Sequence, residues 1–256
     1  MNLDEFLMDE LNISKKKAYE IAYAVDKFNK INSKDKKKKE KKKLNISVPN
    51  YSLGEELFNS ISHGVGALLA IVGLVLLIIK AKGALQETTV ALFGTTMIVL
   101  YVMSCIYHAM SKNLEAKKVL RVIDHCNVYM LVYGTYIPMF FIGIGGKLGW
   151  VFFTVITLIT ILGVVLTAIN VDKSTKIGVI CHLTNGWAAI VAIPKLLVSM
   201  GKGGVIFLIL GGLMYTIGSI LYGIGHKVKY THCIFHIFCL LGTFFQFWCI
   251  YMYLLK

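Results

Sequence analysis

Histidines spaced one helical turn apart are the residues of this sequence best suited to chemistry. His232 and His236 are four positions apart in an apolar run, so a helix would carry both imidazoles on one face. His108 follows Ser104 by the same spacing in an earlier apolar run, and Asp124 stands at the start of another. A catalytic zinc site commonly uses three protein ligands and leaves a fourth position for water. We therefore predict that His108, His232 and His236 bind Zn²⁺.

Asp124 and Ser104, the other two polar residues of these elements, are expected to act beside that metal. Asp124 is the candidate to hold a water at the metal and to act as general base, and Ser104 is the candidate hydrogen-bond donor beside it. The competing interpretation is structural, because an isolated histidine in a helix bundle commonly serves as an interhelical hydrogen-bonding group. Ionisable residues inside apolar spans are rare, however, and several together favour a functional site.

The composition indicates what kind of protein must position these residues. The chain has 256 residues, of which 56% are hydrophobic and 16% charged, and its net charge is +13. Soluble domains are less apolar and carry about 25% charged residues. Arg121 is the single arginine among 27 cations, whereas surfaces that read nucleic acid favour arginine. This composition predicts a membrane protein and argues against a nucleic-acid partner.

Seven apolar runs have the length of about 20 residues that a helix needs to cross a bilayer. They are residues 61–80, 89–110, 125–145, 149–169, 177–198, 203–224 and 233–254. We therefore predict an all-α membrane protein whose residues 51–256 form a seven-transmembrane helix bundle. Residues 1–50 would form a separate, Lys-rich N-terminal segment.

The distribution of cations predicts the orientation of the bundle. Residues 1–44 hold 13 of the 27 cations, and the second, fourth and sixth loops hold more than the other three. By the positive-inside rule the N-terminus is cytoplasmic and the C-terminus is outside, in a multi-pass protein of the cell membrane. The Lys-rich segment would then lie against the anionic leaflet. In this topology the candidate site residues all lie at one depth, near the cytoplasmic face.

The same residues carry a resemblance to a known family. The S-x-x-x-H element ending at His108, the aspartate Asp124 and the H-x-x-x-H element ending at His236 resemble the hemolysin III family. That family is the bacterial branch of the progestin and adipoQ receptors. The lead-in from Gly54 to Gly66 resembles its first motif, so the likeness covers residues 51–256. The wider superfamily includes the alkaline ceramidases, which are intramembrane metal-dependent amide hydrolases.

The resemblance implies a ligand set and also a departure from it. By matching position, zinc would be bound by His108, His232 and His236, and Asp124 would contact it through water. Family members commonly have a further histidine about ten residues past the second ligand of the last span, where this sequence has Gln246. Glutamine is a poor zinc ligand and cannot act as a general acid. The three-histidine site is intact, whereas any role that needs a fourth imidazole at that place is in doubt.

Three functions stay open at this point. One is a zinc-dependent hydrolase, similar to the ceramidases, that cleaves an amide or ester of a membrane lipid. Another is a non-enzymatic receptor or lipid-homeostasis protein with structural zinc. The third is the pore-forming cytolysis that gave the hemolysin III family its name, although a resident seven-span chain does not resemble a secreted pore-former. Oligomeric state stays open as well.

Other polar residues predict structural roles. We expect a cap at the first span, or a dock for its entrance, from a cluster of four residues: Glu55, Glu56, Asn59 and His63. His182 and Asn185 lie in the predicted fifth span. They could line a cavity, but an interhelical hydrogen bond is the favoured prediction for them.

Overall fold

The computed structural model describes residues 14–40, 46–169, 171–172, 174–225 and 228–256, and helices are the only regular elements among them. The chain divides into two compact units, Met1–Asn45 and Ile46–Lys256. Residues 46–50, which the sequence grouped with the N-terminal segment, therefore belong to the second unit.

The described part of the first unit is a single helix, α2 (Lys15–Glu40). It begins directly after Ser14, whose carbonyl oxygen accepts hydrogen bonds from the amides of Lys17 and Ala18. An ion pair of 2.7 Å joins Lys30 to Asp26 one turn earlier. The described side chains of α2 are mostly exposed, and residues 41–45 of the Lys-rich N-terminal segment lie outside the described residues.

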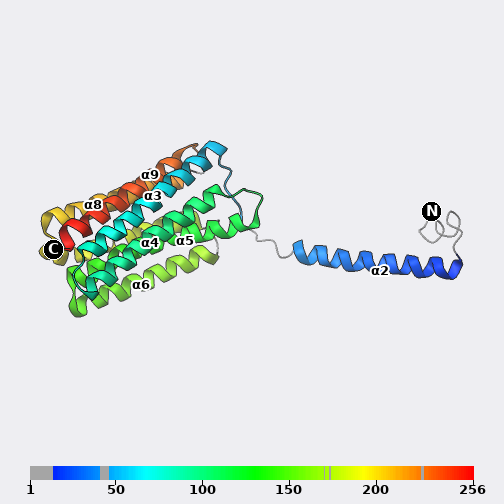
Figure 1. Ribbon diagram of the computed structural model, residues 1–256, viewed down its shortest axis with the longest axis horizontal. Helices are drawn as coiled ribbons and strands as arrows, with labels where there is room; N and C mark the ends of the chain where they lie inside the picture. The colour runs from blue at the N-terminus through cyan, green and yellow to red at the C-terminus, as the bar shows by residue number, and fades with distance from the viewer. Residues whose placement is uncertain (1–13, 41–45, 170, 173, 226–227) are drawn as a thin grey trace. The chain divides into compact units, whose positions relative to one another are not determined.

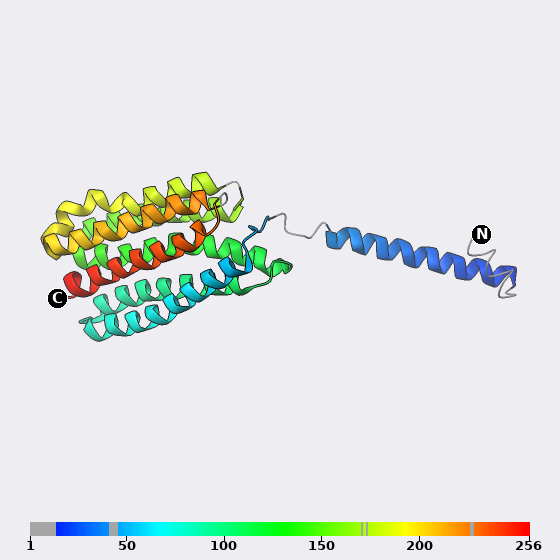
Figure 2. The same ribbon diagram turned by 90° about the horizontal axis from the view of Figure 1, so that it is seen from above.

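The second unit is a bundle of helices that run roughly along one common direction (Figures 1 and 2). Two segments of π-helix and one of 3₁₀-helix continue the α-helices. The elements are α3 (Leu53–Lys80), α4 (Ala84–Ala109), α5 (Glu115–Pro138), η1 (Met139–Ile144), α6 (Gly146–Ile169), α7 (Ser174–Trp187), η2 (Ala188–Ala192), α8 (Ile193–Ile224), α9 (Thr231–Cys249) and η3 (Ile250–Leu254).

Among the described residues, six helical segments are long and apolar enough to cross a membrane. Five of them correspond one to one with predicted runs, and they are Leu53–Lys80, Ala84–Ala109, Glu115–Ile144, Gly146–Ile169 and Thr231–Leu254. The sixth, His182–Ile224, has 43 residues and contains most of the predicted run 177–198 and all of 203–224. The count by length and composition is therefore six, where the sequence predicts seven.

The 43-residue segment does not run straight. Gly201 interrupts α8 with a φ of 69°, a left-handed conformation that glycine adopts without the steric penalty of a Cβ. The indole Nε1 of Trp187 donates a 2.9 Å hydrogen bond to Oγ1 of Thr216. In a continuous helix these two residues would be roughly 40 Å apart. The segment therefore reverses, and its two arms lie side by side.

Apolar side chains cover the outside of the second unit, whereas polar ones are concentrated inside. Large apolar residues with more than half of their surface exposed include Leu68, Ile79, Leu158, Ile169 and Val198. Buried polar residues include Asn59, His63, Ser104, Asn185 and Gln246. Soluble proteins bury their large apolar residues and expose their polar ones. The reverse distribution indicates a lipid environment around the bundle.

A short extended segment, Ile46–Ser52, precedes α3, and we call it the N-terminal strap. Arg121 of α5 is buried; its guanidinium donates a 2.6 Å hydrogen bond to the carbonyl of Ser47 and pairs with Asp172. The Ser47 hydroxyl donates to the same carboxylate at 2.5 Å. Burial alone would raise the pKa of Asp172, but the bonds from Ser47 and Arg121 lower it to about 2. These contacts hold the strap against the ends of α5 and α6.

Candidate metal centre

Three buried imidazoles from two helices meet at one end of the bundle. His108 lies in the last turn of α4, and His232 and His236 lie in the first two turns of α9. Nε2 of His232 is 3.4 Å from Nε2 of His108 and 3.2 Å from Nε2 of His236. One candidate ligand atom of each residue lies within 4.8 Å of the others. The structure thus brings together the three histidines that the sequence predicts as ligands.

Two of the three spacings between these nitrogens match those around a tetrahedral metal ion. Zinc–nitrogen bonds of about 2.0–2.1 Å at tetrahedral angles place neighbouring nitrogens about 3.3 Å apart. The two Nε2 distances along the series His108, His232 and His236 are 3.4 and 3.2 Å. Three neutral imidazoles are also donors that suit zinc and related transition metals. The cluster can therefore hold a metal ion, although imidazole alone does not select which one.

Glu56 of α3 orients one of the three histidines, a role the sequence did not predict. Its Oε2 lies 2.7 Å from Nδ1 of His108, and its Oε1 accepts a 2.7 Å bond from the ammonium of Lys117. A carboxylate at Nδ1 keeps the proton on that nitrogen and leaves the Nε2 lone pair directed at the other two imidazoles. The sequence did contain a clue to this role, because Glu56 shares one helical face with Asn59 and His63 in a mainly apolar helix.

Glu55 positions the helix that carries the other two histidines. It completes a capping box with Ser52 at the start of α3, which confirms the capping role expected of the polar lead-in. Its Oε1 also accepts a 2.9 Å hydrogen bond from the amide of Tyr230, the residue before α9. One carboxylate thus fixes the first turns of α3 and α9 next to each other, and that turn of α9 carries His232.

The N-terminal strap covers the histidine cluster through an aromatic ring. Tyr51 stacks on the imidazole of His232, with ring centroids 4.8 Å apart and an interplanar angle of 17°. Lys112 of the α4–α5 connection donates to the carbonyl of Tyr51 and, at 2.8 Å, to the side chain of Asn50. Burial raises the pKa of the Tyr51 phenol, so the ring stays uncharged.

Asp124 and Ser104 lie beside the cluster, as the sequence predicts. Ser104 is one turn before His108 on α4, and Asp124 belongs to the neighbouring helix α5. Both residues are buried and both line a cavity that His236 also lines. A carboxylate next to three imidazoles can accept a proton from a water that is held between them.

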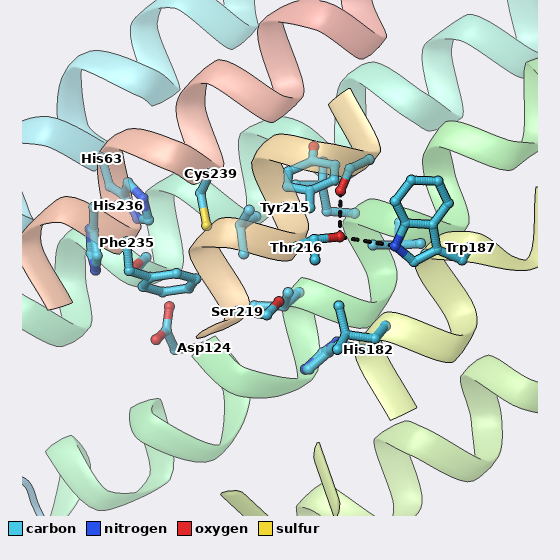
Figure 3. A pocket seen from close by; sticks show the side chains of 18 residues that line it. His63, Asp124, His182, Trp187, Tyr215, Thr216, Ser219, Phe235, His236 and Cys239 are labelled. Atoms are coloured by element: carbon cyan, nitrogen blue, oxygen red, sulfur yellow. Dashed lines mark hydrogen bonds between the residues drawn. The ribbon is translucent and has the colours of Figure 1, made fainter. Parts of the chain in front are cut away.

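The cavity is lined mainly by apolar side chains of α5, α7, α8 and α9 (Figure 3). Figure 3 shows His236 and Asp124 toward one end and Trp187 toward the other. A second pocket shares the walls formed by Trp187 and Tyr215 and continues as far as Gln246. The polar groups therefore stand at one end of an apolar space formed by two adjoining pockets, whose walls have the chemistry that an acyl chain needs.

His63 and Asn59 of α3 complete the polar surroundings. The His63 ring stacks on His236 with centroids 3.7 Å apart and meets Tyr101 edge-on at 5.1 Å. Both side-chain polar atoms of Asn59 are buried without a hydrogen-bond partner among the described residues. Buried polar atoms of this kind are usually satisfied by water or a ligand. Besides docking α3, these residues supply a fourth imidazole and an amide next to the cluster.

Gln246 lies away from the cluster. It is ten residues past His236 on α9, which is roughly 15 Å along the helix axis. Its amide nitrogen donates a 3.1 Å hydrogen bond to the carbonyl of Leu208, and its carbonyl oxygen faces no partner among the described residues. Glutamine at this position therefore removes no ligand from the three-histidine cluster.

The two polar residues of α7 behave differently from each other. Asn185 donates a 3.3 Å hydrogen bond to Thr160 of α6, which confirms the interhelical role that the sequence favours. His182 stacks on Tyr129 of α5 and lines the cavity. For His182 the less favoured alternative, a cavity wall, is the one observed.

Replacing Glu56 with glutamine is expected to weaken metal binding roughly 10–100-fold, because the His108 imidazole loses the carboxylate that fixes its tautomer. A competition titration against a chelator measures the change. Glu115→Gln is the matched control, because Glu115 is half-exposed and pairs with Lys118 rather than with a ligand. Equal metal affinity for Glu56→Gln and the wild type would contradict the orienting role.

Comparison with known proteins adds an independent line of evidence. Residues 51–247 match the family model described as "Haemolysin-III related". Hemolysin-3 of Bacillus cereus is 34% identical over 204 residues, which cover 78% of this chain and 92% of that protein. The Hemolysin-3 homolog of Bacillus subtilis (strain 168) is 33% identical over 80% of this chain and 97% of its own length. The human monocyte to macrophage differentiation factor is 23% identical over 79% of this chain and 85% of its own length.

Proposed function

This chain belongs to the hemolysin III family, and from that premise we propose that it hydrolyses an amide or ester bond of a membrane lipid at a zinc site. It is a multi-pass membrane protein, as its apolar helices and its relatives indicate. One observation carries the proposal: three buried imidazoles converge beside a carboxylate at the end of an apolar cavity. Such a site can accept the acyl chain of a lipid and place the lipid's amide or ester group next to a metal.

We propose seven membrane crossings with the N-terminus in the cytoplasm and the C-terminus outside. The reversal at Gly201 supports two crossings for the 43-residue segment, because its arms lie side by side. The cations before α3 and in the α4–α5 connection support a cytoplasmic location for the end of the bundle that holds the histidines. In this orientation α2, which is Lys-rich, contacts the anionic leaflet.

The proposed ligands are His108, His232 and His236, and the proposed metal is zinc. The neutral nitrogen donors and their spacing of 3.2–3.4 Å support this assignment, as does the carboxylate of Glu56 behind His108. A bound zinc ion would supply Lewis acidity toward a lipid carbonyl and toward water.

Asp124 is the proposed general base. Its carboxylate accepts a proton from the attacking water and later delivers that proton to the leaving nitrogen or oxygen of the lipid. The Ser104 hydroxyl lines the same cavity and is the proposed hydrogen-bond donor beside this carboxylate. The apolar walls of the cavity hold the acyl chain and keep bulk water away from the reacting bond.

A non-enzymatic role with structural zinc is the second candidate, and Tyr51 is the observation that favours it. Its ring covers His232, and all three imidazoles have at most 4% of their surface exposed. Zinc bound there would tie α4 to α9, and the cavity would serve a receptor or a lipid-homeostasis protein. Lysis by a pore, which the name of the Bacillus cereus relative suggests, stays as a third outcome for experiment.

A lipid panel separates these functions. Purified protein is loaded with zinc or stripped by a chelator, and is then incubated with amide-linked and ester-linked lipids whose products are measured by mass spectrometry. Zinc-dependent release of a fatty acid supports the hydrolase. Stoichiometric zinc without turnover of any lipid would move the conclusion to structural zinc. Red-cell lysis by the purified protein, unchanged by substitution of the histidines, would support a pore.

A further inference from the structure

His182 and Ser219 form a polar patch on the cavity wall that the proposed chemistry leaves unused. His182 belongs to α7 and Ser219 to α8, and both line the cavity described above. Both also line an adjoining pocket, which Asp124 and His232 share. Figure 3 shows the two side chains projecting into the same space as Asp124. We call this pair the His182–Ser219 patch.

The imidazole of the patch is held in place while one of its nitrogens lacks a protein partner. The His182 ring stacks on Tyr129 with centroids 3.6 Å apart and an interplanar angle of 26°, which fixes its plane. Its Nδ1 is buried and has no hydrogen-bond partner among the described residues. Buried polar atoms rarely stay unsatisfied in native proteins. A ring that is positioned so firmly next to a cavity is suited to bind a ligand group.

The charges around the His182–Ser219 patch limit which chemical group of a ligand can bind there. Among the described residues that line the cavity and the adjoining pocket, none is a lysine or arginine, and Asp124 is the one carboxylate. A phosphate at this wall would lose its hydration, lie near a carboxylate and gain no side-chain cation. A neutral imidazole and a serine hydroxyl can each donate and accept a hydrogen bond. A hydroxyl group, which also does both, is the complementary ligand group.

We propose that His182 and Ser219 bind a hydroxyl group of an uncharged lipid, and so select hydroxylated lipids over phospholipids. This inference rests on the proposed function, because it places the amide or ester carbonyl of the same lipid at the histidine cluster. The acyl chain then extends toward Trp187, and the hydroxyl-bearing part of the lipid lies between Asp124 and the patch. The two residues determine specificity and take no part in bond cleavage.

The test is a binding titration that does not depend on turnover. Zinc-loaded full-length protein is titrated with oleic acid ethanolamide and with N-ethyl oleamide, which differ by one hydroxyl group. The wild type should bind the ethanolamide about tenfold more tightly, as expected for about one well-made hydrogen bond in a buried site. Ser219→Ala and His182→Phe should each reduce this preference below about twofold and leave the affinity for N-ethyl oleamide unchanged.

Ser199→Ala is the matched control, because the Ser199 hydroxyl bonds the carbonyl of Leu196 and does not line the cavity. Equal binding of the two amides by the wild type, or no binding of either, would overturn the patch as a hydroxyl site. Tighter binding of the phosphate ester of the ethanolamide would overturn the uncharged class. If the protein prefers the hydroxylated amide but hydrolyses no lipid, the proposed hydrolase is wrong and the hydroxyl site stands. If it hydrolyses lipids but shows no preference for the hydroxylated amide, the hydroxyl site is wrong and the hydrolase stands.

Discussion

Replacing His236 with alanine is expected to lower bound zinc from about one ion per chain to less than about a tenth of that. His236 is 1% exposed, and its Nε2 lies 3.2 Å from that of His232, so the variant removes one of the three proposed ligands and leaves only two imidazoles to hold the ion. Elemental analysis of the purified protein after gel filtration measures the loss.

Two further variants separate loss of metal from loss of folding. His182→Gln alters a histidine of the same cavity that lies outside the ligand cluster, and it should keep its zinc. His236→Cys replaces one zinc ligand with another and should retain the ion even if the alanine variant folds poorly. Stoichiometric zinc in folded His236→Ala would show that this residue is not a ligand.

Replacing Asp124 with asparagine is expected to lower lipid hydrolysis about 10²–10⁴-fold while zinc content stays unchanged. The carboxylate is the proposed proton acceptor, and an amide of the same shape cannot take a proton near neutrality. Asp124 lines the cavity, but it is not one of the three clustered donors. Initial rates on the best lipid substrate, measured together with metal content, test the separation.

Asp26→Asn is the matched control for this prediction. Asp26 pairs with Lys30 on the exposed surface of α2, so the same chemical change there should leave the rate within about twofold, as for most surface substitutions. A rate for Asp124→Asn that is also within twofold of the wild type would exclude Asp124 as the general base. Zinc loss in Asp124→Asn would instead assign this carboxylate to the metal's ligand set.

The histidine cluster could be predicted from sequence because two independent regularities agree on it. The i, i+4 spacing places His232 and His236 on one helical face, and the apolar runs place His108 and Asp124 at the same depth. Membrane helices cross the whole bilayer, so depth follows from sequence position even when neighbours are unknown. The structure clusters the three histidines, and it places His236 in one cavity wall together with Asp124 and Ser104.

The groups that orient the cluster could not be predicted in the same way. Glu56 reaches His108 only because α3 packs against α4, and Tyr51 reaches His232 only because the N-terminal strap folds back over the helix ends. Neither contact follows from spacing within one element. The sequence did indicate that polar residues share one face of α3, but it could not say which helix that face contacts.

Helix boundaries and the helix count show the same limit. The apolar run at 125–145 lies within a segment that begins at Glu115, because the first turns of α5 are polar and carry Lys117 and Arg121 into the bundle end. Hydropathy detects only the part of a helix that is apolar. The reversal at Gly201 depends on a single left-handed residue. Hydropathy therefore predicts two crossings, one on each side of Gly201, whereas the helical backbone is interrupted at that residue alone and counts as one long helix.

X-ray absorption at the zinc edge of the purified wild-type protein is the most direct test of a three-histidine zinc site. The predicted spectrum is that of one zinc per chain with three imidazole nitrogens at about 2.0–2.1 Å and one oxygen ligand from water. The spectrum of Glu56→Gln should keep the same nitrogen shell at a lower occupancy. Absence of stoichiometric zinc in the wild type, or a shell containing sulfur from the chain's six cysteines, would contradict the assignment of His108, His232 and His236.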